Sequence, residues 1–382
     1  MTDMRIVSVG LYNPLSFRSG SDTYIISLLN PLGKSYDVTH YYFYKSMIKS
    51  SPRSSQIYFK TEYLEPAYGH GFLNMHNLVQ LTRPDLLVKS DTLNDITAYI
   101  VLCDTFTYHV GKYISKKNNA PLILIKHNIE WKYVQNQIPI VHTFLKHYEH
   151  YILQKADAII TISMNEYRYF MKYVPEEKLY YIPPIIDATF FCPDGISHDF
   201  GNDRLNLLFF GSLDRVMNIN ALKFIKNSLI PLLEKRNLLD KIRVNIFGHG
   251  TPPEYLKLKE DKNINFLGSV DDPARYIRGA DLVLVPVTNQ GGVKIRILEA
   301  LMCGKPVVVM PEASIGIPNK IKEYVFIEKD AEGFLKVIKQ FLEGSYVKKI
   351  DTDFINSYLR ENITVCNIVD EIINKNKSKN DK

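Results

Sequence analysis

The chain of 382 residues lacks the features that would place it in a membrane or outside the cell. No apolar run reaches the roughly 18 residues that a membrane-spanning helix needs. The opening stretch MTDMRIVSVG indicates one short strand, without the apolar segment and cleavage site of a signal peptide. The four cysteines are dispersed and show neither metal-site spacing nor a disulfide framework. These absences predict a cytoplasmic protein.

Further absences limit what the protein binds. The G-x-G-x-x-G fingerprint of a nicotinamide dinucleotide site does not follow the first predicted strand. The only D-x-D, at residues 351–353, lies beyond the last predicted strand, where it indicates a helix cap rather than a metal site. No RNA- or DNA-binding motif stands out. The net charge of +6 is a mild excess that suits an anionic small molecule or a membrane surface better than a nucleic acid.

Short apolar strands alternate with helical patterns along the whole chain. In the first half we predict strands at 4–10, 37–43, 98–104, 122–127, 158–163 and 179–183, and in the second half at 206–211, 243–248, 264–269, 282–287, 306–310 and 324–328. Most are continuous apolar runs, as expected of parallel strands that helices cover on both faces. The segment between the two series, at 182–204, is rich in proline, glycine and aspartate and indicates an interdomain connection.

Two consecutive series of strands and helices predict an α/β fold with two Rossmann-like lobes that face a cleft. We assign residues 1–187 to the first lobe and 188–350 to the second. An amphipathic C-terminal helix is predicted at 351–373, followed by a polar, disordered tail at 374–382.

In open α/β sheets ligands bind beyond the carboxyl ends of the strands, so polar residues there are candidates. Gly20 and Ser21 precede a predicted helix, with Ser21 as its candidate N-cap, and free amides at such a start attract an anion. A flexible loop before a capped helix explains them equally well. His127 ends a buried strand and could donate a proton or a hydrogen bond near neutral pH, although such a histidine is often structural. Loops of the second half add Arg215, Asn218, Gly248 and Gly250.

The stretch GGVKIRILEALMCGKPVVVM is the richest in candidates. Gly291 and Gly292 can present backbone amides at a helix N-terminus, which suits a diphosphate. Lys294 adds a mobile positive charge in the first turn, where a bound anion would relieve its conflict with the helix dipole. Glu299 can accept two hydrogen bonds from a pair of ribose hydroxyls. The alternative is a surface pair of Arg296 with Glu299, which contributes a few tenths of a kcal/mol.

With these residues in place, the sequence resembles glycosyltransferase family 4, the retaining sugar-nucleotide transferases of the GT-B fold. The resemblance covers nearly the whole chain and is carried, in family order, by SGSDTY, IKHNIEW, IPPIIDATFFCP, FFGSLDRVMNINALKF, IFGHGTPP, GSVDDPARYIRGADLVLVPV and GGVKIRILEALMCGKPVV. The fourth segment is similar to the "GSLDWxPN" stretch of one subgroup. The resemblance implies a GT-B fold whose terminal helix crosses back to the first lobe.

The resemblance also implies an activity and a set of roles. A sugar would move from a nucleoside diphosphate sugar to a hydroxyl of a glycan or lipid-linked glycan, with retention and without a bound metal or cofactor. Glu299 would bind the ribose, and the amides of Gly291 and Gly292 would face the diphosphate or the sugar. His127 would approach the sugar and its leaving phosphate. The Gly20–Ser21 pair would close on the diphosphate from the other lobe.

The sequence departs from the family at three positions. Gly291 replaces the first of two usual glutamates, while Ser212 and Asn218 replace a usual arginine and lysine. Since the subgroup carries cations where Lys294 and Arg296 stand, we hypothesise that Lys294, with Arg215, neutralises the diphosphate. We therefore predict catalytic roles for His127, Lys294 and Glu299, and donor contacts from Gly20, Ser21, Arg215, Asn218, Gly248, Gly250, Gly291, Gly292 and Arg296.

Two alternatives stay open. A protein of the same fold could be a sugar-nucleotide 2-epimerase, or a non-catalytic protein that binds a nucleotide sugar or a partner.

Residues 41–63 mix aromatic side chains with Lys45, Lys49, Arg53 and Lys60, which could touch the anionic inner face of a membrane. The same segment reads equally well as a solvated loop and an edge strand.

Overall fold

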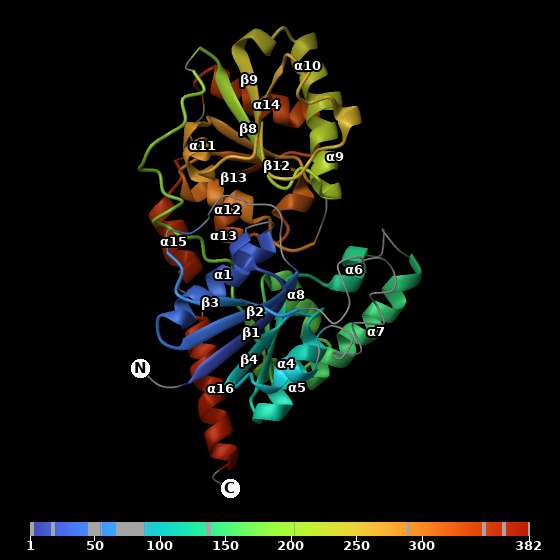
Figure 1. Cartoon of the computed structure of the whole chain (residues 1–382). Helices are drawn as coiled ribbons and strands as arrows, with labels where there is room; N and C mark the ends of the chain where they lie inside the picture. Colours follow the sequence, from blue (N-terminus) through green and yellow to red (C-terminus); the bar gives the residue numbers. More distant parts are fainter. Residues whose placement is uncertain are drawn as a thin grey trace.

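The computed structural model describes residues 4–16, 20–44, 54, 56–65, 88, 90–134, 139–201, 203–288, 291–345, 349–360 and 364–380. They form two lobes, each built on one parallel sheet flanked by helices (Figure 1). The predicted α/β class is confirmed. Of the four cations named for the predicted membrane contact, Lys45, Lys49 and Arg53 lie outside the described residues, and Lys60 begins the strand at residues 60–63.

The sheet of the first lobe has the strand order β3-β2-β1-β4-β5-β6-β7. Its strands are β1 (Arg5–Tyr12), β2 (Asp37–Tyr44), β3 (Lys60–Tyr63), β4 (Ile100–Cys103), β5 (Leu122–Lys126), β6 (Ala158–Thr161) and β7 (Leu179–Tyr181). All neighbours pair in parallel. The six predicted strands are present. For residues 60–63 the sequence left a solvated loop and an edge strand open, and the structure shows the edge strand β3.

The sheet of the second lobe has the order β10-β9-β8-β11-β12-β13 and is also parallel throughout. Its strands are β8 (Leu205–Phe210), β9 (Ile242–Phe247), β10 (Ile264–Gly268), β11 (Leu282–Val285), β12 (Val307–Val309) and β13 (Val325–Ile327). These are the six predicted strands. Because strands in each sheet are parallel, the loops that follow them gather at one edge of that sheet.

Helices connect the strands in both lobes. The first lobe contains α1 (Gly20–Gly33), α4 (Ser90–Asn94), α5 (Tyr108–Asn118), α6 (Glu130–Val134), α7 (Pro139–Lys155) and α8 (Met164–Phe170). The second contains α9 (Val216–Phe224), which continues through a π-helical turn into α10 (Ile230–Lys235), then α11 (Pro273–Gly279), α12 (Ile295–Met302), α13 (Asn319–Lys322) and α14 (Ala331–Leu342). Among the described helices, none is both long and apolar enough to cross a bilayer.

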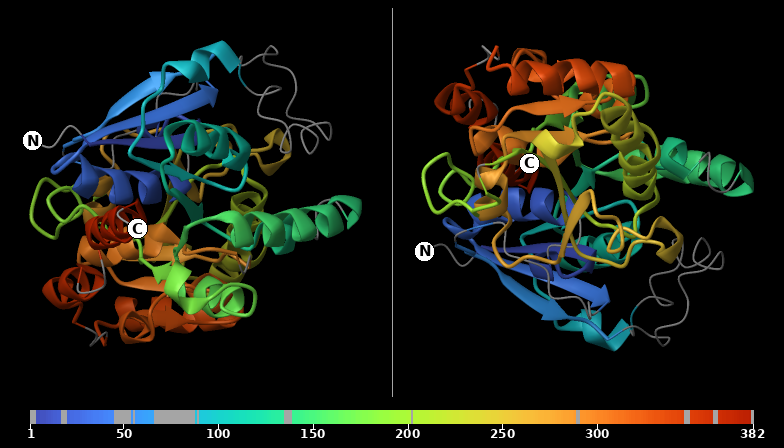
Figure 2. Two further views of the ribbon diagram at one scale, coloured as in Figure 1. Left: turned by 90° about the horizontal axis from the view of Figure 1, so that it is seen from below. Right: turned by 90° about the horizontal axis from the view of Figure 1, so that it is seen from above.

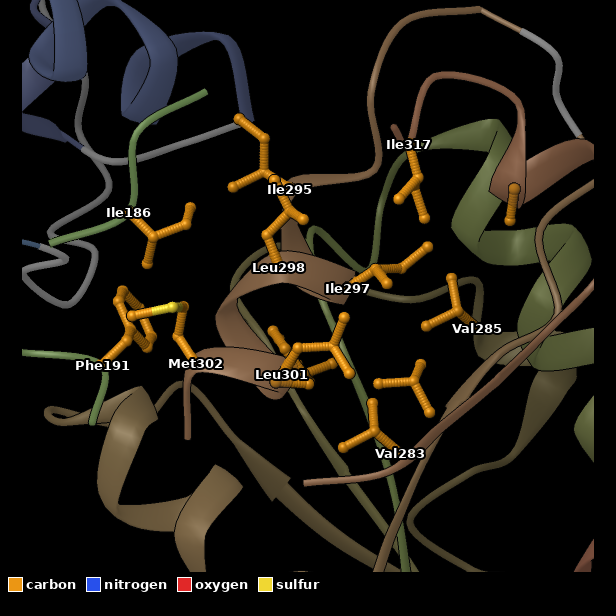
Figure 3. Packing of buried hydrophobic residues seen from close by; sticks show 14 of the residues in the cluster. Ile186, Phe191, Val283, Val285, Ile295, Ile297, Leu298, Leu301, Met302 and Ile317 are labelled. Carbon is orange, nitrogen blue, oxygen red and sulfur yellow. The ribbon is translucent and has the colours of Figure 1, made fainter. Parts of the chain in front are cut away.

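Helix α12 forms the centre of the contact between the lobes. Seven of its eight residues are buried, and Ile295 and Leu298 point toward the first lobe and the connecting segment (Figure 3). Ile186 and Phe191 of that segment pack beside Met302 at the other end of the helix (Figure 3). One continuous hydrophobic cluster therefore joins the second lobe, the connection and helix α1 of the first lobe.

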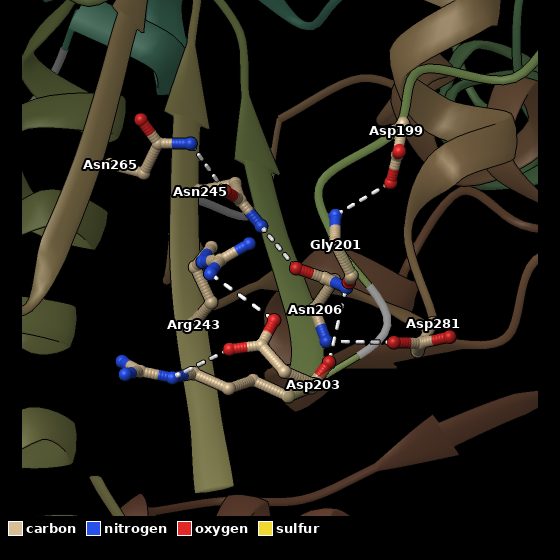
Figure 4. A network of polar contacts seen from close by, with 9 residues as sticks. Asp199, Gly201, Asp203, Asn206, Arg243, Asn245, Asn265 and Asp281 are labelled. Carbon is tan, nitrogen blue, oxygen red and sulfur yellow. Dashed lines mark hydrogen bonds and ion pairs between the residues drawn. The ribbon is translucent and has the colours of Figure 1, made fainter. Parts of the chain in front are cut away.

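The connection at 182–204 is fixed by hydrogen bonds of its own. The carboxylate of Asp187 accepts bonds from the Ser54 hydroxyl at 2.9 Å and the Thr189 amide at 3.0 Å. Just beyond its far end, the backbone amide of Asn206 in β8 donates to the Asp281 carboxylate at 2.7 Å, within the polar network of Figure 4. The predicted lobe boundary at 187/188 falls inside this connection, between the last strand of one sheet and the first of the other.

The C-terminal segment crosses between the lobes, but as two helices instead of the single one predicted. Helix α15 (Thr352–Arg360) packs on α12, and α16 (Val365–Asn380) packs on α1 of the first lobe (Figures 1 and 2). Asp351 accepts a hydrogen bond from the Phe354 amide at 2.8 Å, so the D-x-D does cap a helix. The prediction of disorder from 374 is wrong as far as Asn380, because α16 continues through this polar stretch.

Candidate active site

A cavity of about 430 Å³ lies between the two lobes. Most of its walls are the segments that follow β1, β4 and β5 in the first lobe and β8, β9 and β11 in the second, and His40 of β2 and Ile162 after β6 complete them. Nine of the predicted site residues line it: Gly20, Ser21, His127, Arg215, Asn218, Gly291, Gly292, Lys294 and Arg296. The carboxyl-end rule thus brings together groups from both halves of the chain.

Lys294 lies at the second-lobe wall as the N-cap residue of α12. The sequence predicted a mobile cation in the first turn of the helix, and this prediction is wrong. The helix begins at Ile295, one residue after Lys294, and Lys294 is only 6% exposed. Its ammonium group donates a hydrogen bond to the Gly291 carbonyl oxygen. Burial lowers the pKa of Lys294 to about 8, with Arg296 acting in the same direction and Glu166 opposing both. Lys294 is therefore a preplaced cation that is still mostly charged at neutral pH.

Arg296 and Arg215 add two further cations to this wall. The Arg296 guanidinium donates to the Asn218 side-chain oxygen at 2.8 Å and lies 5.5 Å above the Phe209 ring. Asn218 in turn donates to the Ser212 carbonyl oxygen at 2.7 Å. These contacts fix the orientation of Arg296, whereas Arg215 is an exposed residue at the N-cap of α9.

The loop before α12 touches the first lobe directly. Gly292 has a φ of +62°, and a Cβ added there would lie 2.6 Å from the Asn128 side-chain oxygen. This left-handed backbone explains why α12 begins only at Ile295, although the sequence placed both glycines at its start. Burial raises the pKa of the Glu166 carboxyl group to about 6, while the Glu166 and Gly292 backbones and the Lys294 ammonium oppose this rise. The contact of the Gly292 amide with a diphosphate stays a prediction.

Glu299 is the predicted residue that departs furthest from expectation. Its side chain is 0% exposed and is absent from the cavity walls. The reason is the packing of α12, which buries nearly every side chain of this short helix. The alternative of a surface pair with Arg296 is excluded by the same burial. Its role as a ribose ligand stays a prediction that would need the neighbouring side chains to move.

Gly248 and Gly250 also lie outside the cavity walls, but His249 between them lines the cavity. A Cβ on Gly248 would lie 1.8 Å from the Gly211 carbonyl oxygen, so this glycine allows the loop after β9 to pack on the loop after β8. His249 then faces Ser212, with 3.0 Å between Nε2 and the hydroxyl oxygen. The close approach that the sequence predicted is made to another part of the chain, and the side chain that reaches the cavity is the histidine.

In the first lobe, Gly20 and Ser21 line the cavity from the first turn of α1. Because α1 begins at Gly20, Ser21 lies inside the helix, and the prediction that it is the N-cap is wrong. A Cβ on Gly20 would lie 3.5 Å from the Ile295 side chain, so α1 and α12 approach each other at this point. The helix start therefore faces the cavity and the other lobe together.

His127 lines the cavity with its ring edge-on to Tyr24, at 5.5 Å between centroids. Burial lowers its pKa to about 4, and the neighbouring Lys126 ammonium adds to this effect. The imidazole is consequently neutral at pH 7, which disfavours the proton-donor alternative and leaves the hydrogen-bond donor. Its buried Nδ1 atom has no hydrogen-bond partner.

Two carboxyl groups that the sequence did not select face the cavity from the first lobe. Asp104 follows β4 and accepts hydrogen bonds from the amides of Phe106 at 2.8 Å and Thr107 at 2.9 Å. Glu130 follows β5, and burial raises its pKa to about 8 although Lys126 opposes this. Their position just beyond strand ends is the signal that could have found them.

A fully buried ion pair supports this wall. The Lys126 ammonium donates to Glu149 of α7 and to the Thr105 hydroxyl, and neither charged side chain is exposed. The same Glu149 oxygen accepts the Glu130 amide at 3.1 Å, which fixes the first residue of α6. The cavity is thus polarised, with cations on the second lobe and carboxyl groups on the first. Across the part of the chain that the structure describes, no cluster of three His, Cys, Asp or Glu residues could hold a metal ion.

Residues 204–344 match the family model for Glycosyl transferases group 1. The second lobe is therefore similar in sequence to this family. The matched residues include the cations Arg215, Lys294 and Arg296 of the cavity. A comparison with the sequences of curated proteins finds no match.

Solved structures of glycosyltransferases share the fold of the whole chain. Sucrose-phosphate synthase from Thermosynechococcus elongatus superposes with a TM-score of 0.68 at 15% identity, covering 97% of this chain and 94% of that one. Anabaena HepE in complex with UDP and glucose gives 0.64 at 15%, covering 98% and 100%. WaaG, a glycosyltransferase involved in lipopolysaccharide biosynthesis, gives 0.60 at 16%, covering 93% of both. The chain therefore has the GT-B fold.

Proposed function

We propose that the protein is a retaining glycosyltransferase that moves a sugar from a nucleoside diphosphate sugar to an acceptor hydroxyl of a glycan or lipid-linked glycan. The observation that carries the proposal is the row of cations Arg215, Lys294 and Arg296 on the second-lobe wall of the cavity. The group 1 glycosyltransferase match of that lobe and the UDP and glucose of the HepE complex support it.

The donor would bind with its diphosphate against the second lobe. A diphosphate carries negative charge that ammonium and guanidinium groups neutralise with charge-assisted hydrogen bonds. Lys294 and Arg296 are held in place before any ligand arrives, so little ordering of these side chains opposes binding. The acceptor would then approach from the first lobe, whose wall offers carboxyl groups and the His127 ring.

Retention would proceed by attack on the same face that the diphosphate leaves. Double displacement needs an ionised carboxylate as nucleophile. Glu130, with its pKa raised to about 8, is mostly protonated at pH 7. Burial also raises the pKa of Asp104, and one of its two carboxylate oxygens, Oδ1, accepts three hydrogen bonds. The departing diphosphate would take the acceptor proton, and the cations would stabilise its developing charge, at roughly 3–4 kcal/mol for one well-placed donor.

The first test is thermal unfolding of the purified protein with UDP, GDP, ADP and NAD. A ligand at 100 times its dissociation constant adds about 2.7 kcal/mol to the free energy of unfolding. We expect a shift with one nucleoside diphosphate and none with NAD. Product analysis with the matching sugar nucleotide then distinguishes a transferase, which yields free nucleotide and glycosylated acceptor, from an epimerase, which yields a new sugar nucleotide.

Lys294→Met removes the buried cation and keeps the length of the side chain. We expect kcat/KM for the donor to fall by about 10²- to 10³-fold, because the developing diphosphate charge loses one donor. Lys336→Met, which removes an exposed lysine of α14, is the control and should leave turnover unchanged. Equal turnover of Lys294→Met and wild type would contradict the proposal that Lys294 neutralises the diphosphate.

A further inference from the structure

A lysine and a glutamate that are both 0% exposed form an ion pair behind the first-lobe wall of the cavity. Lys126 is the last residue of β5, whose other residues are leucine and isoleucine, and Glu149 belongs to α7. Helix α7 projects from the side of the first lobe (Figures 1 and 2), and none of its described residues lines the cavity. The pair can therefore act on the site only through other residues.

Stability alone does not explain this ion pair. Two charges that leave water lose hydration free energy, and apolar side chains of similar volume often stabilise a core as well as such a pair does. The compensation here is incomplete, because Glu149 Oε2 is buried with no hydrogen-bond partner among the residues that the structure describes. The contribution of the pair has to be sought in what it holds in place.

The other carboxylate oxygen of Glu149 fixes the start of α6. This atom, Oε1, accepts hydrogen bonds from the Lys126 ammonium and from the backbone amide of Glu130, the latter at 3.1 Å. Glu130 is the first residue of α6, and amides in the first turn of a helix have no partner within that helix. Glu149 thus supplies the missing acceptor from another helix, while the side chain of Glu130 lines the cavity.

Two further contacts extend this hold to the loop after β4. The Lys126 ammonium donates to the Thr105 hydroxyl, and the Tyr148 hydroxyl of α7 donates to the Thr105 carbonyl oxygen at 3.3 Å. Thr105 directly follows Asp104, which lines the cavity. The buried cluster of Lys126, Tyr148 and Glu149 therefore fixes the backbone beside both carboxyl groups of this wall.

We propose that the buried cluster positions the carboxyl groups of Asp104 and Glu130 for the hydroxyls of the acceptor. Carboxyl groups accept hydrogen bonds from hydroxyls, and displacement by about 1 Å is enough to lose much of their effect. The role toward the acceptor rests on the function proposed above, whereas the hold on the two segments does not. The cations proposed for the diphosphate stand on the other lobe, so the cluster leaves donor binding unchanged.

The decisive test uses the ligand-free protein and replaces both charges at once. In Lys126→Met with Glu149→Leu we expect amide hydrogen exchange of the peptide 127–134 to accelerate by about tenfold or more, because the Glu130 amide loses its acceptor. The urea midpoint should stay close to that of wild type, because no buried charge is left unpaired. Glu149→Gln keeps an oxygen at this place and should retain part of the protection. Unchanged exchange in the double variant would overturn the proposal.

Two further variants distinguish the hold on the wall from a general loss of structure. Lys257→Met with Glu260→Leu removes an exposed ion pair of the second lobe that does not line the cavity, and the exchange of 127–134 should stay unchanged. Tyr148→Phe removes a single hydroxyl group, so it tests the cluster even if the double variant does not fold. It should accelerate the exchange of 104–107 and leave 127–134 unchanged, and unaltered exchange at 104–107 would count against the proposal.

Kinetics separate positioning from a merely structural role. The dissociation constant of the nucleoside diphosphate that stabilises wild type should be the same in the double variant. Release of nucleotide from the matching nucleotide sugar, with octyl glucoside or water as acceptor, should fall at least about tenfold. Equal losses of nucleotide affinity and turnover would mean that the cluster only supports the fold, against the proposal. If wild type binds no nucleoside diphosphate while exchange in the double variant still accelerates, the proposed function fails and the hold on the wall stands.

Discussion

At the scale of single residues, the cavity depends on titratable groups whose pKa values are moved by burial. Glu130 is the clearest case, because its carboxyl group is 7% exposed and its pKa is raised to about 8. His127 and Lys294 are shifted by the same cause in the direction that disfavours their cationic forms. The wall of the first lobe is therefore less charged at pH 7 than its sequence suggests.

Glu130→Gln should change how stability depends on pH. The folded state keeps the proton of Glu130 up to about pH 8, whereas the unfolded chain releases it near 4.5, so wild type loses stability as pH rises between these values. Between pH 6 and pH 8 we expect wild type to lose about 2 kcal/mol relative to Glu130→Gln. Urea unfolding of both proteins at the two pH values measures the difference, and parallel pH dependences would show that Glu130 ionises normally.

Residue identity alone did not reveal which candidates reach the cavity. Lys294 and Arg296 were found because cations beside glycines at a predicted helix start are unusual in that place. Glu299 was chosen by the same argument, yet the rotation of α12 encloses it in the core. The position of a side chain around a helix that is buried on nearly all sides cannot be derived from its hydrophobic pattern.

At the scale of elements, the loop before α12 decides how the two lobes meet. Its left-handed Gly292 allows the backbone to approach Asn128 and His127 of the first lobe. The sequence predicted glycines for close approach to a phosphate, and the structure adds that one of them makes a close approach to protein. Both requirements exclude a side chain at this position.

Gly292→Ala tests this contact against a matched control. The added Cβ would lie 2.6 Å from the Asn128 side-chain oxygen, so the loop must shift and donor turnover should fall at least about tenfold. Gly344→Ala introduces alanine at a nearly equal φ of +65° with nothing within 4 Å. Its cost is the backbone strain alone, about 1–2 kcal/mol, with normal turnover. Equal kinetics of the two variants would contradict a functional role of the close contact.

At the scale of the whole molecule, the terminal helices fasten the two lobes together. Helix α15 packs on α12 of the second lobe and α16 on α1 of the first, and α1 and α12 are the two helices that meet beside the cavity. The Tyr36 hydroxyl also bonds to Asp370 of α16. The C-terminal crossing therefore braces the elements that carry the site, and none of its described residues lines the cavity.

Ile368→Ala measures what the docking of α16 contributes. Ile368 is fully buried, and replacing such a side chain with alanine typically costs about 2–5 kcal/mol of unfolding free energy. Asn374→Ala, at an exposed position of the same helix, should change stability by less than about 0.5 kcal/mol. Denaturant unfolding compares the two variants. Equal stabilities would mean that α16 does not pack on the first lobe in solution.

The sequence by itself determined the two-lobed α/β architecture and the order of its motifs. This was possible because buried parallel strands appear as continuous apolar runs, and because parallel strands bring their following loops to one edge. Twelve strands and nine cavity residues were found in this way. The same local rules did not predict the break between α15 and α16, or the helical turns that continue to Asn380.

Only the tertiary structure decided how the lobes meet and which polar groups face each other across the cavity. Gly292 lies against Asn128 and His127 only because two distant segments of the chain pack together. The burial of Glu299 and the shifted pKa values of His127, Glu130 and Lys294 have the same origin. Burial and electrostatic interactions depend on neighbours in space, and these neighbours come from parts of the chain that no local pattern connects.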